Sequence, residues 1–322
     1  MNEKHDKQPN ESKAEALHRW LIRAICCLGV AALAGLAIGG VLLFRIGQMS
    51  GWSSPWQRDG QVEIYSQEQI DKFITSVLIT VQNQPLGQAN AQADMVFIAS
   101  FNAFEQRLTV VALAGQTLVE VEGYGQKSLA EAFALGGPGL LVNTMNKNFG
   151  LDLQNYASTD THSLAAMIDL LGGIQAQLTH SEADYINAAL GEGDLRAGRA
   201  TLTGTQSMVH AMDSLSGHNP LGNLERSLAL VHSAIFNMRK TATKEAMLPL
   251  LSLVFSNIQT NLDLTALNDL GYEILKAEEI EYASLILPAE GSWEAAGPNG
   301  ENLQADVPAN AELLRKTLYD AR

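Results

Sequence analysis

The apolar residues of this chain fall into runs that predict a sheet with buried central strands. Met95–Ser100 is one continuous apolar run, and Leu108–Leu113 is a second. Uninterrupted apolar runs of this length are typical of strands that are covered on both faces. A shorter run follows at Thr117–Val121, and the tight turn Gly123-Tyr124-Gly125 comes after it. The pattern therefore predicts three successive strands.

A helix is expected directly after that turn. Ser128 precedes Glu131 by three residues, which is the spacing of a capping box, in which each side chain bonds the other residue's backbone N–H. Gly136-Gly137 ends this helix, and Pro138 can begin the next one because it has no N–H and its φ is already helical. We expect the second helix to end at Gly150.

The rest of the chain alternates between helical and extended patterns. Ser181 is expected to cap a helix that runs to Leu190. Thr203 and Gln206 have the spacing of a second capping box, which opens a helix to about Met212. The other expected elements are helices over 67–76, 162–171, 221–239 and 246–255, and strands over 77–81 and 174–178.

The first part of the chain predicts a membrane anchor. Residues 24–44 carry no charge and are bounded by Arg23 and Arg45. At about 1.5 Å per residue, a helix of this length crosses a bilayer core of about 30 Å. More Lys and Arg residues precede the run than follow it closely, which places the N-terminus in the cytoplasm. A cleaved signal peptide is the alternative, but its apolar region is usually only about 7–15 residues long.

These features divide the chain into a cytoplasmic tail (1–20), a transmembrane helix (21–46), a stalk (47–66) and an extracytoplasmic domain (67–322). We therefore expect a single-pass protein of the cell membrane with its bulk outside the cell. The net charge of −14 argues against a nucleic-acid partner, because such proteins normally carry a basic face. With 46% hydrophobic and only 17% charged residues, the chain can build a large core.

Five short motifs have the order and spacing of a known family. They are Gly123-Tyr124-Gly125, Gly136-Gly137-Pro138, Asn148–Tyr156, Ile168–Gly173 and Leu202–Gln206. In these motifs the chain resembles the LytR-CpsA-Psr family of membrane-anchored cell-envelope proteins, over a stretch from about residue 77 to 318. The resemblance implies an α/β fold, an α-β-α sandwich with a central mixed, largely antiparallel sheet flanked by helices, preceded by one transmembrane helix.

The resemblance also implies a chemistry. Members of this family are understood to transfer a glycopolymer from a polyprenyl-pyrophosphate carrier to peptidoglycan. The implied partners are the membrane, a polyprenyl-(pyro)phosphate lipid or glycopolymer, and peptidoglycan. Arginines suit the pyrophosphate because their planar fork bonds two oxygens at once, and carboxylates bind the Mg²⁺ that neutralises the developing charge. The polyprenyl tail is expected in an apolar tunnel, which here would open near Asp94 and Lys127.

This chain keeps only part of that charged site. Asp94 stands at a metal-ligand position and Arg226 stands at a pyrophosphate-binding position. Lys127 stands one place before the position of the family's lysine. Uncharged residues occupy the other matching positions, which are Gln82, Gln92, Gly115, Gln116, Met212, Ser214 and Asn223. Each lost charge-assisted hydrogen bond removes about 1.5–3 kcal/mol of binding, and a single carboxylate is a poor hold on Mg²⁺. We therefore expect the family reaction to be impaired, and no catalytic residue is assigned.

Each surviving residue also has an ordinary structural interpretation. Asp94 can bond the backbone of its own loop, and Lys127 can be a solvated turn residue. Arg226 can pair with Glu225 or with a carboxylate one helical turn away. In that case none of the three residues would be a ligand-binding group.

Three functions fit this pattern. The first is an atypical transferase with a rebuilt phosphate site, for which His210 and His218 are candidate replacement contacts. The second is a non-catalytic polyprenyl-lipid-binding or scaffold protein of the envelope, and the third is an anchored domain with an unrelated function. Because the loops over 82–90 and 214–219 are neutral apart from His218, the sequence favours the second over the first.

Overall fold

The computed structural model describes residues 63–65, 68–86, 88, 91–191, 193–213, 221–241, 257–262 and 280–319. All of them belong to one compact unit of the chain, which begins at Arg58. None of the helices in these ranges is long and apolar enough to cross a membrane. The apolar run at 24–44 and the helix expected over 246–255 lie outside the described residues.

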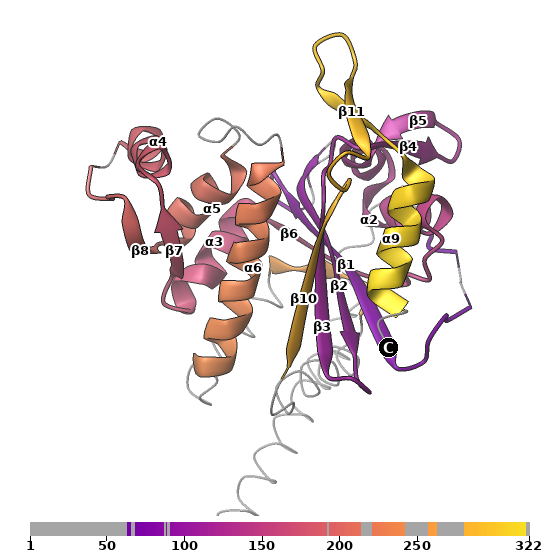
Figure 1. Cartoon of the computed structure of the whole chain (residues 1–322), viewed down its shortest axis with the longest axis horizontal. Helices are drawn as coiled ribbons and strands as arrows, with labels where there is room; N and C mark the ends of the chain where they lie inside the picture. The colour runs from indigo at the N-terminus through magenta and orange to yellow at the C-terminus, as the bar shows by residue number, and fades with distance from the viewer. Residues whose placement is uncertain are drawn as a thin grey trace, which may run out of the picture. The chain divides into compact units, whose positions relative to one another are not determined.

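A mixed six-stranded sheet lies at the centre of the described part, in the order β10-β3-β2-β1-β6-β9 (Figure 1). Its strands are β1 (Ile74–Gln82), β2 (Ala93–Asn102), β3 (Arg107–Leu113), β6 (Asn155–Asp160), β9 (Gln259–Thr260) and β10 (Glu281–Leu287). The pairs β1–β2, β2–β3 and β6–β9 are antiparallel, whereas β1–β6 and β3–β10 are parallel. The expectation of a central mixed sheet is confirmed.

Helices cover both faces of this sheet, as Figure 1 shows. They are α2 (Leu129–Phe149) and α9 (Val307–Tyr319) on one face, and α3 (Thr161–Leu170), α5 (Gly204–Met212) and α6 (Gly222–Thr241) on the other. Along β2, Val96 and Ile98 join the core under α2 and α9, whereas Met95 and Phe97 join the core under α3, α5 and α6. Successive side chains of a strand point to opposite faces, so a sheet covered on both sides needs an uninterrupted apolar run.

The helix α2 begins and bends where the sequence predicts. The Ser128 hydroxyl accepts from Glu131 N at 3.2 Å, and Glu131 Oε2 accepts from Ser128 N at 2.8 Å, so the capping box is confirmed. Gly137 interrupts the helix with φ 67° and ψ −163°, a conformation essentially restricted to glycine. Pro138 opens the second half, and Gly150 ends it in the left-handed conformation.

The helix α5 begins with the second predicted capping box and lies very close to α3. The Thr203 hydroxyl accepts from Gln206 N at 3.3 Å, and Gln206 Oε1 accepts from Thr203 N at 3.0 Å. Between them, Gly204 donates its N–H to Asp169 Oδ1 at 2.7 Å. A Cβ on Gly204 would lie 1.9 Å from the carbonyl oxygen of Ala165. The backbones of α3 and α5 can therefore meet here only with glycine at 204.

Three two-stranded antiparallel sheets lie outside the main sheet in the described residues. They are β4 (Leu118–Val121) with β5 (Gly125–Ser128), β7 (Ile174–Leu178) with β8 (Gly198–Leu202), and β11 (Trp293–Ala296) with β12 (Asn302–Ala305). The helix α4 (His180–Leu190) connects β7 to β8. In Figure 1 the β4–β5 hairpin and β11 lie at one end of the sheet, whereas β7, β8 and α4 lie to one side, beyond α5 and α6.

The helix expected over 67–76 is wrong, because no helix forms over the described residues of that range. The strand β1 begins at Ile74, which is buried and pairs with Asn102 of β2. Ile70 and Phe73, which gave the segment its helical spacing, are 47% and 43% exposed and form no buried helix face. Pairing with β2 therefore outweighed the local pattern.

The cap expected at Ser181 is also wrong. The helix α4 is capped two residues earlier by Thr179, whose hydroxyl accepts from Glu182 N while the Glu182 carboxylate accepts from Thr179 N. The spacing of Thr179 and Glu182 is that of a third capping box, which satisfies two N–H groups where a lone serine would satisfy one.

Candidate functional site

Asp94 is the extra residue of a β-bulge between β1 and β2. Val81 pairs with Met95 and Gln82 pairs with Ala93, so Asp94 has no opposite residue in the ladder. Bulges redirect a side chain and are frequent beside functional sites. Asp94 is half-buried, and this burial raises the pKa of its carboxyl above the ordinary value. Within the described ranges it has no hydrogen-bond or ion-pair partner, so the backbone bond considered for it does not form there.

The loop after β3 lies beside the start of the strand that carries Asp94. Gly115 O accepts from Ala130 N at 2.9 Å, which holds the loop against the N-terminus of α2. A Cβ on Gly115 would lie 3.4 Å from the carbonyl oxygen of Ala93, the residue before Asp94. This is an ordinary contact distance, so the position has room for a side chain. With glycine at 115 and glutamine at 116, the loop brings no cation to the carboxylate.

Lys127 lies on β5 and pairs with the helix that follows it. Its Nζ is 3.7 Å from Glu131 Oε1, and the two side chains are 39% and 43% exposed. The hydrogen bond from Ser128 N lowers the pKa of Glu131, and the charge of Lys127 adds to this effect. Exposed pairs of this kind contribute only about 0–1 kcal/mol, so Lys127 can leave Glu131 for a ligand at little cost.

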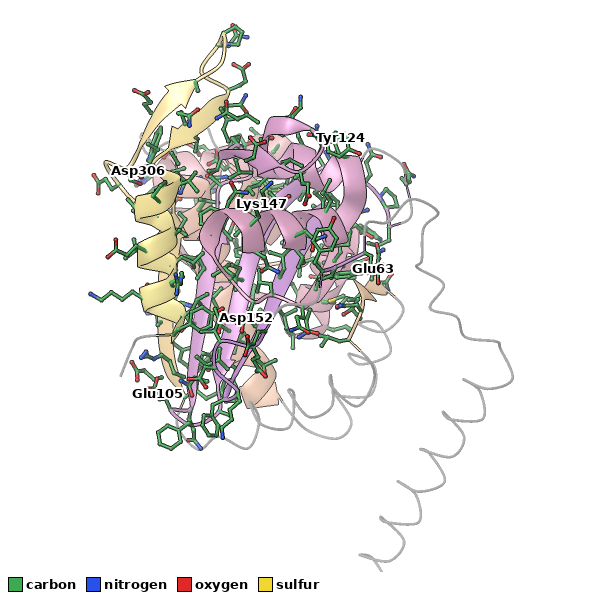
Figure 2. All side chains as sticks on the ribbon, turned by 90° about the vertical axis from the view of Figure 1, so that its right-hand side faces the viewer. Glu63, Glu105, Tyr124, Lys147, Asp152 and Asp306 are labelled. Atoms are coloured by element: carbon green, nitrogen blue, oxygen red, sulfur yellow. The ribbon has the colours of Figure 1, made fainter. Side chains whose placement is uncertain are left out.

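The turn beside Lys127 lies at one end of the domain. Figure 2 shows Tyr124, at the tip of the β4–β5 turn, at the opposite end of the described structure from Glu105 in the β2–β3 turn. Tyr124 is 49% exposed. Gly123 and Gly125 have φ of 80° and 70°, which is the backbone that the tight turn requires.

Arg226, on the first turns of α6, is used inside the protein. Its Nε donates to His210 O at 2.9 Å, and its NH2 donates to Asp213 O. Its NH1 lies 3.6 Å from Glu182 Oε1, and the two side chains are only 13% and 14% exposed. The ion pair therefore joins α6 to α4, and the carboxylate comes from a helix distant in sequence.

Glu182 and His210 complete a cluster that three helices build around Arg226. His210 Nε2 lies 3.3 Å from Glu182 Oε1. Burial lowers the pKa of His210, although Glu182 opposes this effect, so the ring is neutral at neutral pH. Burial also disfavours the ionised form of Glu182, but hydrogen bonds from Thr179 and the adjacent His210 outweigh it and lower the pKa of Glu182. A neutral ring facing a carboxylate does not suit the phosphate contact considered for His210.

The three candidate residues have separate surroundings. Within the described ranges no hydrogen bond or ion pair joins Asp94, Lys127 and Arg226 to one another, and two of them have a carboxylate of the protein as partner. Their assignment to ligand or metal binding stays a prediction. Sequence reasoning missed Glu182 as the partner of Arg226, and the only local signal was its place in the capping box that begins α4.

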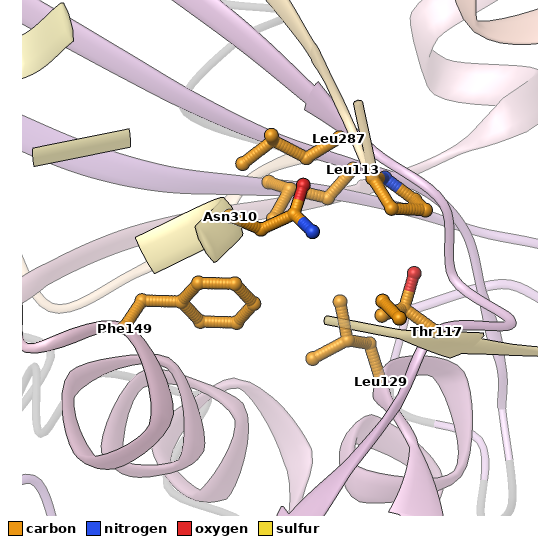
Figure 3. A pocket seen from close by; sticks show the side chains of 8 residues that line it. Leu113, Thr117, Leu129, Phe149, Leu287 and Asn310 are labelled. Carbon is orange, nitrogen blue, oxygen red and sulfur yellow. The ribbon is translucent and has the colours of Figure 1, made fainter. Parts of the chain in front are cut away.

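Two cavities in the described residues bear on the expected tunnel. One of about 10 Å³ lies among α2, α9, β3 and β10, beside Phe149 and Asn310 (Figure 3), and has room for one water at most. The other, of about 300 Å³, lies among β7, β8, α4, α5 and α6 and is lined in part by Arg226. Asp94 and Lys127 line neither cavity, so the tunnel beside them stays a prediction.

The residues present do not fit a magnesium ion held by the protein alone. The described residues contain no group of three or more His, Cys, Asp or Glu side chains that could hold a metal. Mg²⁺ requires near-octahedral oxygen ligands, usually one or two carboxylates together with substrate phosphates. Asp94 supplies one carboxylate, and the matching second position is Gln82, whose side-chain amide donates to Gln84 O at 2.7 Å. Magnesium is therefore expected here only in company with a phosphate ligand.

A sandwich with a mixed sheet, a carboxylate on a bulge between two central strands and the motif order described above define one class of protein. The LytR_cpsA_psr family model matches residues 53–316. The chain belongs to the LytR-CpsA-Psr family and is a cell-envelope protein of the glycopolymer-transferase type.

Two relatives show how far this chain has diverged. It is 22% identical over 247 residues to "Regulatory protein MsrR" of Staphylococcus aureus (strain COL), which covers 76% of this chain and 74% of the relative. It is 24% identical over 197 residues to "Polyisoprenyl-teichoic acid--peptidoglycan teichoic acid transferase TagU" of Enterococcus faecalis, which covers 60% of each chain.

Solved structures share the fold. The structure "TagT bound to LIIa-WTA" matches with a TM-score of 0.63 at 17% identity, over 80% of this chain and 99% of that chain. "LytR-CPS2A-psr family protein YwtF (TagT) with bound octaprenyl pyrophosphate lipid" matches with a TM-score of 0.59 at 18% identity, over 80% and 99%. At these identities the likeness shows the architecture, and the chemistry has to be argued from the residues.

Proposed function

We propose that this protein is a catalytically impaired member of the glycopolymer-transferase class. In this proposal it is anchored in the cell membrane and holds a polyprenyl-(pyro)phosphate-linked glycopolymer outside the cell, but transfers it to peptidoglycan poorly or not at all. Family membership supports the class of ligand, since one relative is named a teichoic acid transferase and one matching structure contains octaprenyl pyrophosphate. The charge environment of the candidate residues supports the impairment.

The observation that carries the proposal is the engagement of Arg226. Phosphoryl transfer depends on fixed cations that stabilise the charge on the transferring group. The guanidinium of Arg226 already contacts two backbone carbonyls and the Glu182 carboxylate. A pyrophosphate would have to displace Glu182, which burial and hydrogen bonds keep in place. The one arginine that matches the family pattern is therefore a poor anion ligand.

The surroundings of Asp94 support the same conclusion. In a working site a carboxylate that binds a metal is held ionised by nearby positive charge. Here the carboxyl is half-buried without a cationic partner in the described residues, and its pKa is raised. The adjacent loop carries Gly115 and Gln116 where the family pattern has arginine and aspartate. Both changes weaken the binding of a metal–pyrophosphate complex.

The alternative is a protein without any transfer activity, which binds a polyprenyl lipid or serves as a scaffold. The retention of the described fold elements beside the loss of charge favours this alternative over a rebuilt active site. The capping box of α2 and the Gly204 contact between α3 and α5 are both intact. A protein that only holds a lipid or a partner would need this scaffold but not the arginines.

A turnover assay separates the impaired enzyme from an active one. We expect the full-length protein, supplied with a polyprenyl-pyrophosphate analogue and Mg²⁺, to release no phosphate and to transfer no saccharide. Lipid that co-purifies with the protein should be identified by mass spectrometry, because a bound polyprenyl species supports the holding function. Robust turnover that Asp94→Ala abolishes would contradict the proposed impairment.

A further inference from the structure

Exposed aromatic side chains gather at one end of the central sheet. At this end β1 begins, β2 ends, and β3 and β10 begin, because β1–β2 and β2–β3 are antiparallel and β3–β10 is parallel. Phe73 precedes β1, Phe104 lies in the turn between β2 and β3, and Tyr282 is the second residue of β10. The three residues are 43%, 74% and 40% exposed. Figure 2 marks this end by Glu105, the residue after Phe104.

The helix α6 adds a fourth aromatic side chain to this end. Phe236 is 65% exposed and lies one helical turn after His232, whose ring centroid is 6.1 Å from that of Tyr282. Phe104 and Phe236 are the two most exposed large hydrophobic residues in the part of the chain that the structure describes. Exposed apolar residues that are grouped mark a surface for interaction, whereas single ones are ordinary. Phe73, Phe104, Phe236 and Tyr282 together form the aromatic end of the domain.

The rings of Phe73 and Phe104 lie against each other, and a lysine lies beside them. Their centroids are 5.8 Å apart, and the backbone joins them because Ala103 N donates to Phe73 O at 2.9 Å. Lys72 Nζ lies 5.0 Å from the centroid of the Phe73 ring. Exposed aromatic rings with a long cationic side chain are typical of surfaces at a membrane–water interface, where the rings lie at headgroup level and the ammonium stays in water.

The charges beside these rings do not favour an anionic partner. Next to the rings in the chain stand two cations, Lys72 and Arg107, and three carboxylates, those of Asp71, Glu105 and Glu281. Arg107 lies 3.4 Å from Glu105 and 3.7 Å from Glu281, measured between side-chain nitrogen and oxygen. Attraction to anionic lipid needs a cluster of unpaired lysines and arginines. The rings are therefore what this end offers, and a contact made by them depends little on salt.

The sequence places a bilayer within reach of the aromatic end. Glu63 and Tyr65 are held to Asn143 of α2 by hydrogen bonds of 2.8 and 3.0 Å. Between Glu63 and the predicted anchor at 21–46 lie only residues 47–62, which span at most about 55 Å when fully extended. A tether of this length keeps the domain beside the membrane, so a weak surface contact suffices. Four partly exposed rings are too few for the roughly 1,000 Å² of a specific protein interface.

We propose that the aromatic end docks on the bilayer surface, with its four rings at the level of the lipid headgroups. The proposal rests on the membrane anchor of the proposed function but on none of its chemistry. The strand β2 has 10 residues and leads from this end to the bulge at Asp94, a length of about 30 Å. Docking turns the surroundings of Asp94 away from the bilayer. A polyprenyl-linked headgroup held there has left the plane of the membrane.

Depth-dependent quenching tests the orientation. The full-length protein is placed in phosphatidylcholine nanodiscs that contain nitroxide-labelled lipid. A bimane label is attached at Ala103→Cys beside the rings or, for comparison, at Tyr124→Cys at the opposite end of the domain. Both variants also carry serine in place of the natural cysteines Cys26 and Cys27. We expect lipid quenching at 103 and none at 124. Equal quenching at the two positions, or none at 103, would overturn the proposal.

Matched variants show whether the rings make the contact. Phe73→Ser combined with Phe104→Ser should abolish the quenching at 103, while the unfolding temperature stays unchanged because both side chains are exposed. Leu135→Ser is the control, because Leu135 lies on α2 and is as exposed as Phe73, at 43%. This control should leave the quenching at 103 unchanged. Full quenching in the double variant would overturn the proposal.

The composition of the nanodiscs distinguishes the bilayer surface from other occupants. Quenching at 103 should be the same in phosphatidylcholine alone and with added phosphatidylglycerol, at low and at high salt. Quenching that requires phosphatidylglycerol and is lost at high salt would mean capture of an anionic headgroup. Disulfide-linked dimers of Ala103→Cys in place of quenching would assign this end to a second copy. Either result would overturn the proposal. A protein that does not enter the nanodiscs would contradict the predicted anchor and this proposal with it.

Discussion

Two regions of this molecule carry the charges that the sequence singles out, and each handles them in a different way. Around Asp94 and Gly115 a half-buried carboxylate has no cationic partner among the described residues, and its pKa is raised. Around Arg226 a cation is matched by Glu182, whose pKa is lowered. In the first region the Asp94 carboxylate, which has no cationic partner among the described residues, lies beside Gly115, where there is room for a side chain. In the second region the guanidinium of Arg226 is already paired with the Glu182 carboxylate.

The comparison teaches that a count of charged residues does not give the charge available to a ligand. Counted alone, Arg226 and Asp94 would suggest that one pyrophosphate-binding cation and one metal-binding carboxylate remain available. Their surroundings make the arginine a structural link between α4, α5 and α6, and leave the carboxylate without the field that would bind a metal. The differences between the two regions can be tested one by one.

The largest expected effect concerns the space at two glycines. A Cβ on Gly204 would lie 1.9 Å from Ala165 O, whereas a Cβ on Gly115 would lie 3.4 Å from Ala93 O. Gly204→Ala should therefore destabilise the protein by about 3 kcal/mol or more, since backbone has to move. Gly115→Ala should be neutral or slightly stabilising. Urea unfolding measures both, and an equal loss in the two variants would refute the difference in space.

The next effect isolates the ion pair of Arg226. Glu182 and Glu131 hold the same position in their capping boxes, so alanine at either should cost about 1 kcal/mol through the lost cap. Glu182→Ala should lower the unfolding free energy by about 2 kcal/mol more, because the buried guanidinium of Arg226 loses its carboxylate partner. The loss is limited because Arg226 keeps its two carbonyl partners. Equal unfolding free energies for Glu182→Ala and Glu131→Ala would show that the pair contributes nothing.

A smaller effect is the opposite response of the two acids to pH. The pKa of Asp94 is higher in the folded protein than its ordinary value of 3.8. This difference stabilises the fold at pH values below 3.8, and the stabilisation is lost as the pH rises through the folded pKa. The lowered pKa of Glu182 stabilises the fold above its ordinary value of 4.5, and this contribution is lost as the pH falls through the folded pKa.

Two neutral variants measure this contrast. At pH 7, Asp94→Asn should be more stable than the wild type and Glu182→Gln less stable. The Asp94→Asn difference should shrink as the pH falls from the folded pKa of Asp94 to 3.8, and the Glu182→Gln difference should shrink as the pH falls below 4.5 through the folded pKa of Glu182. Thermal unfolding across this pH range gives the sign of each difference. A loss of stability in Asp94→Asn at pH 7 would mean that the carboxylate has a favourable partner after all.

The smallest effect is expected at Lys127. Its pair with Glu131 is exposed, so Lys127→Ala should change the unfolding free energy by no more than about 0.5 kcal/mol. A loss above about 1 kcal/mol, measured by urea unfolding beside Lys147→Ala on the last turn of α2, would show that Lys127 is fixed and cannot turn toward a ligand.

Local sequence signals predicted much of the scaffold. The capping boxes at Ser128 and Thr203, the break at Gly137 and the continuous run of β2 depend on residues close together in the chain. The strand β10 was not expected, because its residues alternate only weakly and its partner β3 lies far away in the sequence. Long-range pairing of this kind leaves little local trace.

The candidate site was predictable only in part. The loss of arginines is visible in the sequence, since an uncharged residue at 115 or 116 needs no structure to be recognised. The partner of Arg226 is not visible, because Glu182 stands on another helix and its spacing already serves the cap of α4. The bulge at Asp94 also depends on register, which the pattern of β2 alone does not fix.

One measurement tests the central claim most directly, which is that no residue in the described part of the chain supplies an available cation beside Asp94. Calorimetry should compare pyrophosphate binding, in the presence of Mg²⁺, to the wild type, to Gly115→Arg and to Gln116→Arg, with Gln126→Arg as the control for added charge. We predict no detectable binding to the wild type or the control and detectable binding to at least one loop variant, since one charge-assisted hydrogen bond contributes about 1.5–3 kcal/mol, which is about tenfold or more in affinity. Tight binding to the wild type that Asp94→Ala abolishes would contradict the account.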